Sequence, residues 1–177
     1  IKLGNWAKSY YSRLFSSANI YQAALQTLQI LSFLAMISSD FYELQQKNKK
    51  GLTMEHTAKV LTSYEEQLNN AASVLPAPAE NICFFDIETT GLYAKSSSLY
   101  LIGTITFENN EWVLNQWFAD DYVSEVRLLQ AFSEFSEKYE WIAHYNGATF
   151  DIPYLEKKYR TNHMPSPFAG KQTLDLY

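Results

Sequence analysis

The chain has 177 residues and an apolar content of 47%, enough for one domain of ordinary size with a hydrophobic core and an appendage. Its formal net charge of −5 argues against a protein that holds nucleic acid on a broad basic face. It does not exclude a nuclease, because a metal-dependent site is itself acidic. The single cysteine, Cys83, permits no intramolecular disulfide and fits a reducing compartment, so we expect a cytoplasmic protein.

Residues 1–72 favour helix and predict a helical N-terminal segment. Residues 14–39 carry no charge, and the span 20–37 is long enough to cross a membrane. Three glutamines at helical spacing make a polar stripe in that span, which favours an amphipathic helix that is buried or faces a protein partner over a membrane segment: Gln22, Gln26 and Gln29. A second helix is expected from Met54 to Asn70.

Residues 73–80 contain two prolines and several small residues, which is typical of a linker. After them the pattern changes to strands at 81–88, 99–108 and 111–118, with a turn at Asn109-Asn110.

The second half of the chain alternates helix and strand. Apolar residues at steps of three predict a helix over 123–139, and an apolar strand follows at 141–145. A further helix is expected over 150–160, then a loop over 161–170 and a strand from 172. This order predicts an α/β domain over 81–177, with a mixed sheet and flanking helices.

Two carboxylates stand two residues apart at the end of the first apolar strand. Asp86 and Glu88 project from the same face, because side chains alternate along a strand. Burying unpaired like charges is costly, and a bound cation removes that cost. Mg²⁺ prefers carboxylate oxygen, and a pair of metal ions suits phosphodiester chemistry. A solvated strand edge is the alternative, but the apolar approach and the following Thr89-Thr90-Gly91 turn favour a metal site.

A third carboxylate, Asp151, follows the Asn146-Gly147 break at the start of a helix. There it can point into the crevice at the strand ends, where α/β folds place ligands. Taken alone, Asp151 is more simply a residue that caps the helix or favours its dipole.

Together these segments resemble the first and second motifs of the DEDD superfamily of 3′–5′ exonucleases, which have the ribonuclease-H-like fold. The resemblance is closest to the bacterial YprB-type ribonuclease-H-like domain. It rests on residues 84–92, 98–103 and 145–155 and covers residues 80–177. The fold that it implies is a ribonuclease-H-like mixed sheet with flanking helices, preceded by the helical N-terminal segment.

The resemblance also implies an activity, the hydrolysis of terminal phosphodiester bonds at the end of single-stranded DNA or RNA. Asp86, Glu88 and Asp151 would hold two Mg²⁺ or Mn²⁺ ions, one activating a water and the other stabilising the leaving 3′ oxygen. The residues expected beside the terminal nucleotide and its cleft are Thr89, Thr90, Gly91, Leu92 and Asn146.

The chain departs from the family pattern in its third motif. That motif has a Tyr or His general base and a fourth metal-binding Asp, and it does not occur before Tyr177. Asp175 is expected to be an accessory acid near the cleft. We therefore expect the domain to be C-terminally incomplete and these 177 residues to lack the general base and the fourth carboxylate. The alternative is a catalytically impaired nucleic-acid-binding or scaffold domain of the same fold.

Basic residues follow Asp151 on the expected helix: Lys157, Lys158 and Arg160. A solvated helix face is the simpler interpretation, and contact of Lys157 and Lys158 with substrate phosphates is the functional one. Tyr93, Tyr145 and Tyr154 are candidates for stacking on unpaired bases, although most aromatic residues of such a chain belong to its packing.

Overall fold

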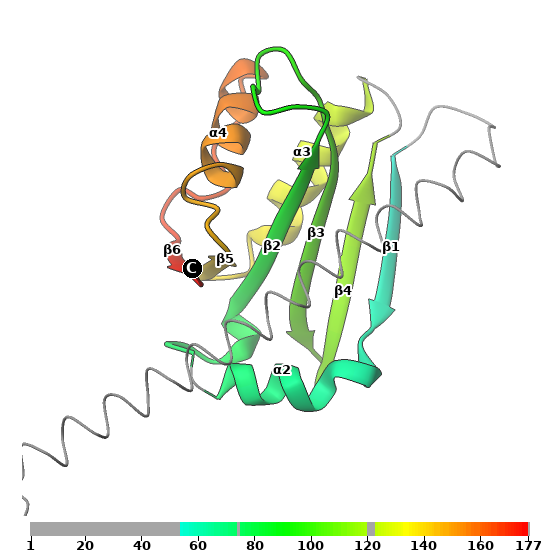
Figure 1. Cartoon of the computed structure of the whole chain (residues 1–177), viewed down its shortest axis with the longest axis vertical. Coiled ribbons are helices and arrows are strands. Elements are labelled where there is room, and N and C mark those ends of the chain that lie inside the picture. Colours follow the sequence, from blue (N-terminus) through cyan, green and yellow to red (C-terminus); the bar gives the residue numbers. More distant parts are fainter. Residues whose placement is uncertain (1–53, 74, 120–122, 177) are drawn as a thin grey trace, which may run out of the picture.

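The computed structural model describes residues 54–73, 75–119 and 123–176. These residues form a six-stranded sheet in the order β1-β4-β3-β2-β5-β6 (Figure 1). The expected α/β fold with a mixed sheet is confirmed. The strands are β1 (Glu55–Val60), β2 (Ile82–Thr89), β3 (Leu99–Glu108), β4 (Glu111–Phe118), β5 (Trp141–His144) and β6 (Gln172–Asp175).

The sheet is antiparallel on one side of β2 and parallel on the other. β1, β4, β3 and β2 pair antiparallel in turn, whereas β2 pairs parallel with β5, and β5 with β6. β2 therefore lies at the change of direction. Its first half belongs to the core, because Ile82, Cys83 and Phe85 are almost completely buried.

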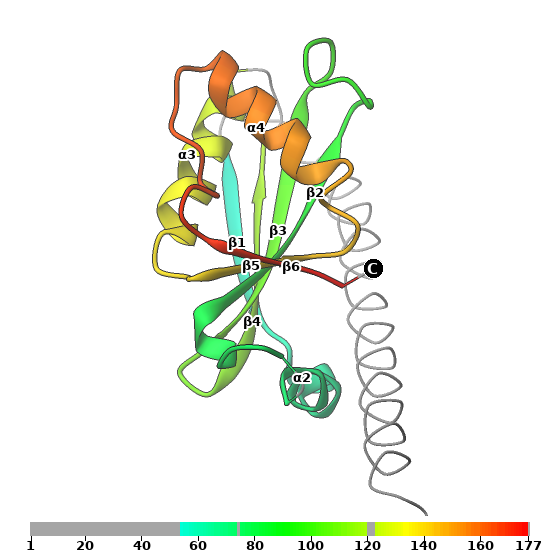
Figure 2. The same cartoon turned by 90° about the vertical axis from the view of Figure 1, so that its left-hand side faces the viewer.

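Helices pack on both faces of the sheet (Figure 2). One face, which we call the helical face, is covered by α3 (Ser124–Ser136) and α4 (Asp151–Thr161), whose apolar residues join the larger core. The opposite face carries α2 (Glu65–Ala72) at one end, over a smaller core that includes Leu68, Phe84 and Leu114. Two short 3₁₀ turns, η1 (Thr62–Tyr64) and η2 (Ala79–Asn81), complete the described elements.

One expected helix is partly wrong. Residues 55–60, placed in a helix over 54–70, instead form β1 along the edge of β4, and the helix begins only at Glu65. Pairing with β4 explains the difference: the His56 ring stacks on Trp117 at 4.9 Å, and His56 Nε2 lies 3.2 Å from Asn115 Oδ1. Tertiary contacts of this kind override local helix propensity. The strand β1 thus joins the sheet although it precedes residues 73–80 in the chain. A linker role for residues 73–80 stays a prediction.

The other expected elements are confirmed with shifts at their ends. The strands over 99–108 and 111–118 begin and end as expected, whereas α3 ends three residues earlier than the predicted 139. Among the described residues, none of the helices combines the length and apolar character that a membrane-crossing segment needs. The amphipathic helix expected at 20–37 lies outside the described residues.

Candidate active site

The carboxylate pair lies on the part of β2 that extends beyond its parallel neighbour. β5 pairs with β2 only along Ile82–Phe84, and Asp86 and Glu88 come after that stretch. On the other side Asp86 lies directly opposite Gly103 of β3, where an added Cβ would meet no described atom within 4 Å. Asp86 and Glu88 share the face opposite to the helical face, as the alternation predicts. Asp86 therefore lies beside a residue that has no side chain to pack against it.

Asp151 reaches the same strand end from α4. It is the first residue of the helix and only 8% exposed. The backbone N–H of Ile87 lowers the pKa of both the Asp86 and the Asp151 carboxyl groups, which places both carboxyls close to it. Ile87 comes after the stretch of β2 that pairs with β5. Asp86, Glu88 and Asp151 thus lie together at one strand end, although up to 65 positions separate them in the sequence.

The electrostatics of this cluster favour protons or cations. Burial first, and then the charges of Asp151 and Glu88, raise the pKa of Asp86 to about 7. Burial also raises the pKa of Asp151 to about 6, against backbone hydrogen bonds that lower it. Burial raises the pKa of Glu88 as well. Carboxylates that are buried together without a basic partner hold their charge at a cost, which a bound cation offsets.

The donor set fits hard divalent cations, because all three side chains offer carboxylate oxygen. As the side chains are placed, no group of three or more His, Cys, Asp or Glu residues within 54–73, 75–119 and 123–176 is arranged to hold a metal ion. The three acids are therefore candidate ligands at one strand end. Their side chains would have to rotate to bind one ion together.

The turn between β5 and α4 is held by side chains around it. Asn146 has a φ of 51°, and its N–H donates to Asp175 Oδ1 at 2.8 Å. The buried His144 ring accepts the Gly147 N–H at Nδ1, 3.1 Å away. A Cβ at Gly147 would come within 2.9 Å of the His144 side chain, so the position requires glycine. Asn146 and Asp175 thus shape the approach to α4, and the Asp175 charge contributes to the raised pKa of Asp151.

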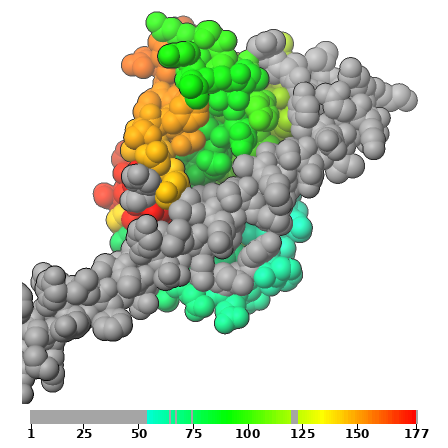
Figure 3. Space-filling model, in the orientation of Figure 1, coloured from blue at the N-terminus to red at the C-terminus, as the bar shows by residue number. Residues whose placement is uncertain are grey.

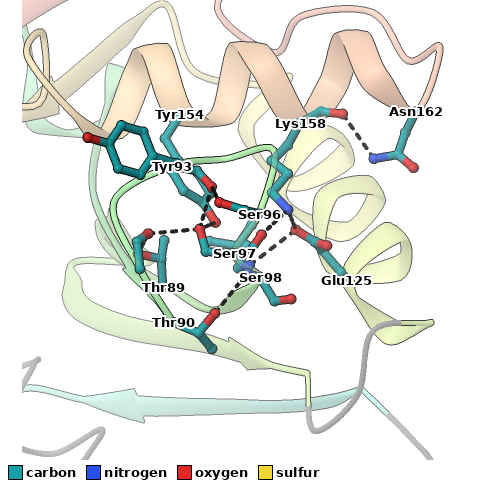
Figure 4. A network of polar contacts seen from close by, with 12 residues as sticks. Thr89, Thr90, Tyr93, Ser96, Ser97, Ser98, Glu125, Tyr154, Lys158 and Asn162 are labelled. Carbon is teal, nitrogen blue, oxygen red and sulfur yellow. Dashed lines mark hydrogen bonds and ion pairs between the residues drawn. The ribbon is translucent and has the colours of Figure 1, made fainter.

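The turn after Glu88 is ordered by its own hydroxyl groups (Figure 4). Thr89 Oγ1 and Ser97 Oγ both donate to the Gly91 carbonyl, at 2.9 and 2.8 Å. Thr90 pairs with Ser98 through its backbone N–H and its side-chain oxygen, both at 2.9 Å. We call this segment the 89–98 loop. Its hydrogen bonds involve Thr89, Thr90 and Gly91, so these residues, which were expected beside the substrate, hold the loop in shape. Leu92 lies at its tip and is 76% exposed.

Lys158 is not available for substrate phosphates, which corrects one sequence-based expectation. It is 7% exposed, its Nζ lies 2.6 Å from Glu125 Oε1, and it donates to the Ser97 carbonyl at 2.6 Å (Figure 4). Glu125 Oε1 also accepts the Leu99 N–H. The Glu125–Lys158 pair therefore fastens the 89–98 loop to α3 and α4. Lys157, next in the chain, stays half-buried at the surface.

Sequence reasoning missed Gln116. It lies on β4 opposite Gly103, in the same cross-strand row as Asp86. Its side chain is 6% exposed, and its Nε2 atom is buried with no hydrogen-bond partner among the described residues. Buried polar groups are nearly always paired, so an unpaired one calls for an explanation. Two adjacent polar residues, Asn115 and Gln116, between the apolar residues of the strand 111–118 were the signal that could have found it.

The fold and the three acids define the class of protein: a mixed sheet with candidate metal-binding carboxylates at the end of its central strand. The family model of the RNase H superfamily matches residues 83–177, more than half of the chain. The chain belongs to this superfamily. The ribonuclease-H-like fold expected from the motifs is thereby confirmed.

Solved structures with a similar fold include two DNA enzymes. The family B DNA polymerase of the hyperthermophilic archaeon Pyrobaculum calidifontis is 20% identical, with a TM-score of 0.45, over 54% of this chain and 15% of that one. E. coli exonuclease I, in complex with a dT13 oligonucleotide, is 18% identical with a TM-score of 0.43, over 54% and 27%. The chain thus spans less than a third of either protein. No curated protein matches the chain.

Proposed function

We propose that the protein is a metal-dependent 3′–5′ exonuclease that hydrolyses the terminal phosphodiester bond of single-stranded nucleic acid. The observation that carries this proposal is the convergence of Asp86, Glu88 and Asp151 at the end of β2, with the pKa of each raised. Membership of the RNase H superfamily supports a nuclease-type function. A cytoplasmic location stays a prediction.

The three acids would hold two Mg²⁺ or Mn²⁺ ions, which when bound activate a water and neutralise charge on the reacting phosphodiester. The chain's own residues supply position. The rigid end of β2 fixes Asp86 and Glu88, and the turn at Asn146-Gly147 fixes the start of α4. Such pre-organisation lowers the barrier because no reorganisation is needed during the reaction.

The substrate end would lie between the 89–98 loop and the start of α4. Thr89, Thr90 and Gly91 hold the loop, and Leu92 is exposed at its tip. Asn146 is exposed on the other side. An end of this kind admits an unpaired strand, whose bases are free for contact.

The test uses the full-length protein and oligonucleotides labelled at the 5′ end. With Mg²⁺ or Mn²⁺ we expect a ladder of shortened labelled products, whereas excess EDTA stops the reaction. Asp86→Asn and Asp151→Asn are expected to reduce the rate by about a hundredfold or more, because each removes a carboxylate that would hold a metal ion. Glu111→Gln, an exposed acid at the far end of β4, is the matched control and keeps full activity.

Two results would contradict the proposal. Degradation that persists in Asp86→Asn and Asp151→Asn would show that these acids do not carry the reaction. Binding of single strands by the wild type without any hydrolysis would instead favour the nucleic-acid-binding or scaffold domain. DNA and RNA oligonucleotides of one sequence, compared side by side, identify the preferred substrate through the effect of the 2′-hydroxyl.

A further inference from the structure

The face of the sheet opposite to the helical face is covered at one end by α2. Phe84, Ile105 and Leu114 form a cross-strand row there, and all three belong to the smaller core together with Leu68 of α2. Figure 3 views the molecule from this side and shows the surface of α2 at the lower end, whereas the green surface of the 89–98 loop lies at the upper end. Packing against α2 therefore explains why the residues of the lower end are buried.

The upper end of the same face is buried as well. Leu101 and Phe118 lie opposite each other on β3 and β4, two rows away from the row that α2 covers, and each is only 4% exposed. Neither side chain belongs to the two cores that the described residues form. An uncovered face of an antiparallel sheet stays partly in solvent, so burial this complete indicates a second layer of protein over this end. We call the end of the face that Leu101 and Phe118 form the distal patch.

The chain contains a segment whose sequence fits such a layer. Residues 14–39 carry no charge, and four of their apolar residues recur at the spacing of one side of a helix, away from the three glutamines: Ile20, Ala24, Leu28 and Leu31. A helix with one apolar side is stable in water only when that side packs on an apolar surface. The distal patch offers a surface of this kind.

The chain that precedes the described residues enters the sheet at the distal patch. The described chain begins at Met54, and the next residue, Glu55, is the Cα partner of Phe118. The link over residues 40–54 can extend to roughly 50 Å at about 3.3 Å per residue, whereas neighbouring strands lie only about 4.8 Å apart. Residues 14–39 can therefore reach the distal patch of their own chain, and the short link gives them a high effective concentration there.

We propose that residues 14–39 dock on the distal patch as an amphipathic helix and form the second layer over this end of the sheet. Glu88 lies in the same cross-strand row as Leu101 and Phe118, so the docked segment borders the carboxylate cluster. The inference goes beyond the proposed function, and it does not depend on exonuclease activity.

The first experiment measures how accessible the distal patch is in the full chain. Leu101→Cys places a thiol in the patch, and its labelling by iodoacetamide is followed by peptide mass spectrometry. Cys83, which is completely buried, stays in place and reports global unfolding. We expect Leu101→Cys to label about tenfold more slowly, or slower still, than Val123→Cys, because Val123 is 73% exposed and thiol reactivity depends on exposure.

A charge on the apolar side of the segment should uncover the distal patch. Leu28→Glu puts a carboxylate into the proposed apolar contact, where it would be buried without a partner. Added to Leu101→Cys, it should accelerate labelling at position 101 by about tenfold or more through local opening, while Cys83 stays unlabelled. Gln26→Glu adds the same charge on the side of the glutamines and is the matched control, in which labelling stays slow.

The second experiment changes the patch and measures the segment. Chymotrypsin cleaves after aromatic residues, of which residues 14–39 contain Phe15, Tyr21 and Phe33. In the full chain, Leu101→Asn puts an amide into the patch and should accelerate cleavage within residues 14–39 by about tenfold or more. Val126→Asn, at an exposed position of α3, should leave the cleavage rate as in wild type. Equal cleavage in the two variants would contradict docking at the patch.

Four results of the labelling experiment would overturn the proposal. One is labelling of Leu101→Cys as fast as that of Val123→Cys. Another is equal labelling at position 101 with Leu28→Glu and with Gln26→Glu. The third is slow labelling that becomes faster on dilution, together with dimers in light scattering, which would assign the patch to a second copy of the chain. The fourth is fast labelling of a chain that sediments with phosphatidylcholine vesicles, which would assign residues 14–39 to a membrane.

Discussion

Two groups of buried charges lie on either side of the 89–98 loop, and they are built differently. The Glu125–Lys158 pair joins opposite charges 2.6 Å apart and adds hydrogen bonds to the Ser97 carbonyl and the Leu99 N–H. The carboxylate cluster at the end of β2 gathers only acids, and burial raises their pKa values. The first group is balanced within the protein. The acids of the second form no ion pair with a Lys or Arg among residues 54–73, 75–119 and 123–176, so protons or bound cations would balance them.

The difference separates structural charges from candidate functional ones. A charge that has both an ion-pair partner and hydrogen bonds stabilises the chain around it. The Glu125–Lys158 pair holds the 89–98 loop against α3 and α4 in this way (Figure 4). Like charges repel one another, so they stay close together only where the rest of the fold holds them in place. Such sites are often functional. The predictions below test whether the two groups differ in this way.

The largest expected effect comes from breaking the balanced pair. Lys158→Met should lower the free energy of unfolding by about 3–5 kcal/mol, because it leaves Glu125 buried without its cation. Urea unfolding of the metal-free protein measures it. Lys157→Met, one residue away and half-buried, is the control and should change stability by less than about 0.5 kcal/mol.

A double variant makes this prediction sharper. Glu125→Gln with Lys158→Met removes both charges and keeps an oxygen that can accept the Leu99 N–H. It should recover part of the loss, since removing both partners of a buried pair is less costly than removing one. A double variant less stable than Lys158→Met alone would contradict the account of the pair.

The turn that positions Asp151 is tested by adding one methyl group. Gly147→Ala should destabilise the protein by about 1–3 kcal/mol, because the new Cβ would lie 2.9 Å from the His144 side chain. Gly103→Ala is the matched control, since a Cβ there meets no described atom within 4 Å and should be tolerated. Thermal unfolding compares the two. Equal tolerance of both substitutions would show that the β5–α4 turn is not packed as described.

The unbalanced cluster predicts a pH dependence with a definite sign. The pKa of Asp86 is raised from 3.8 to about 7, so between these pH values the folded state binds more protons than the unfolded state. Metal-free wild type should therefore lose stability progressively as pH rises from about 4 to 7. Asp86→Asn should flatten this decline, and Glu111→Gln should not.

Cations should act on the same cluster. Millimolar Mg²⁺ or Mn²⁺ is expected to raise the melting temperature of wild type at pH 8 and to have little effect on Asp86→Asn, because an ion that binds only the folded state stabilises it. A shift of equal size in both proteins would mean that the ions bind elsewhere.

The smallest expected effect concerns the unpaired amide near Asp86. Gln116→Leu should raise stability by about 1 kcal/mol, because it removes the buried and unsatisfied Nε2 atom. The neighbouring Asn115→Leu is the contrast: Asn115 Oδ1 pairs with His56 Nε2, so its loss should not stabilise the protein. Denaturant midpoints distinguish the two. A destabilised Gln116→Leu would show that the amide makes an interaction within the folded chain.

Much of the candidate site could be predicted from sequence because its signals are local. The apolar approach to Asp86 and Glu88 specifies a buried strand, and the Asn146-Gly147 break before Asp151 specifies a turn into a helix. The strands over 99–108 and 111–118 follow from the same reasoning, since the Asn109-Asn110 turn fixes both of their inner ends, with φ positive at both residues.

The role of each charged residue could not be predicted in this way. Lys157 and Lys158 are neighbours of one residue type, yet Lys157 is half-buried at the surface and Lys158 is buried against Glu125. The strand β1 was missed for a similar reason, because its six residues are all exposed and only their pairing with β4 makes them a strand.

The sequence by itself determined the order of helices and strands after residue 80, the family and the three candidate metal-binding acids, because periodicity, turn residues and short motifs act over a few positions. Only the tertiary structure decided which charges balance one another, where β1 joins the sheet and how the Glu125–Lys158 pair fastens the 89–98 loop to α4. Burial and pairing depend on residues that are distant in sequence, and these alone set the free energy of each charge.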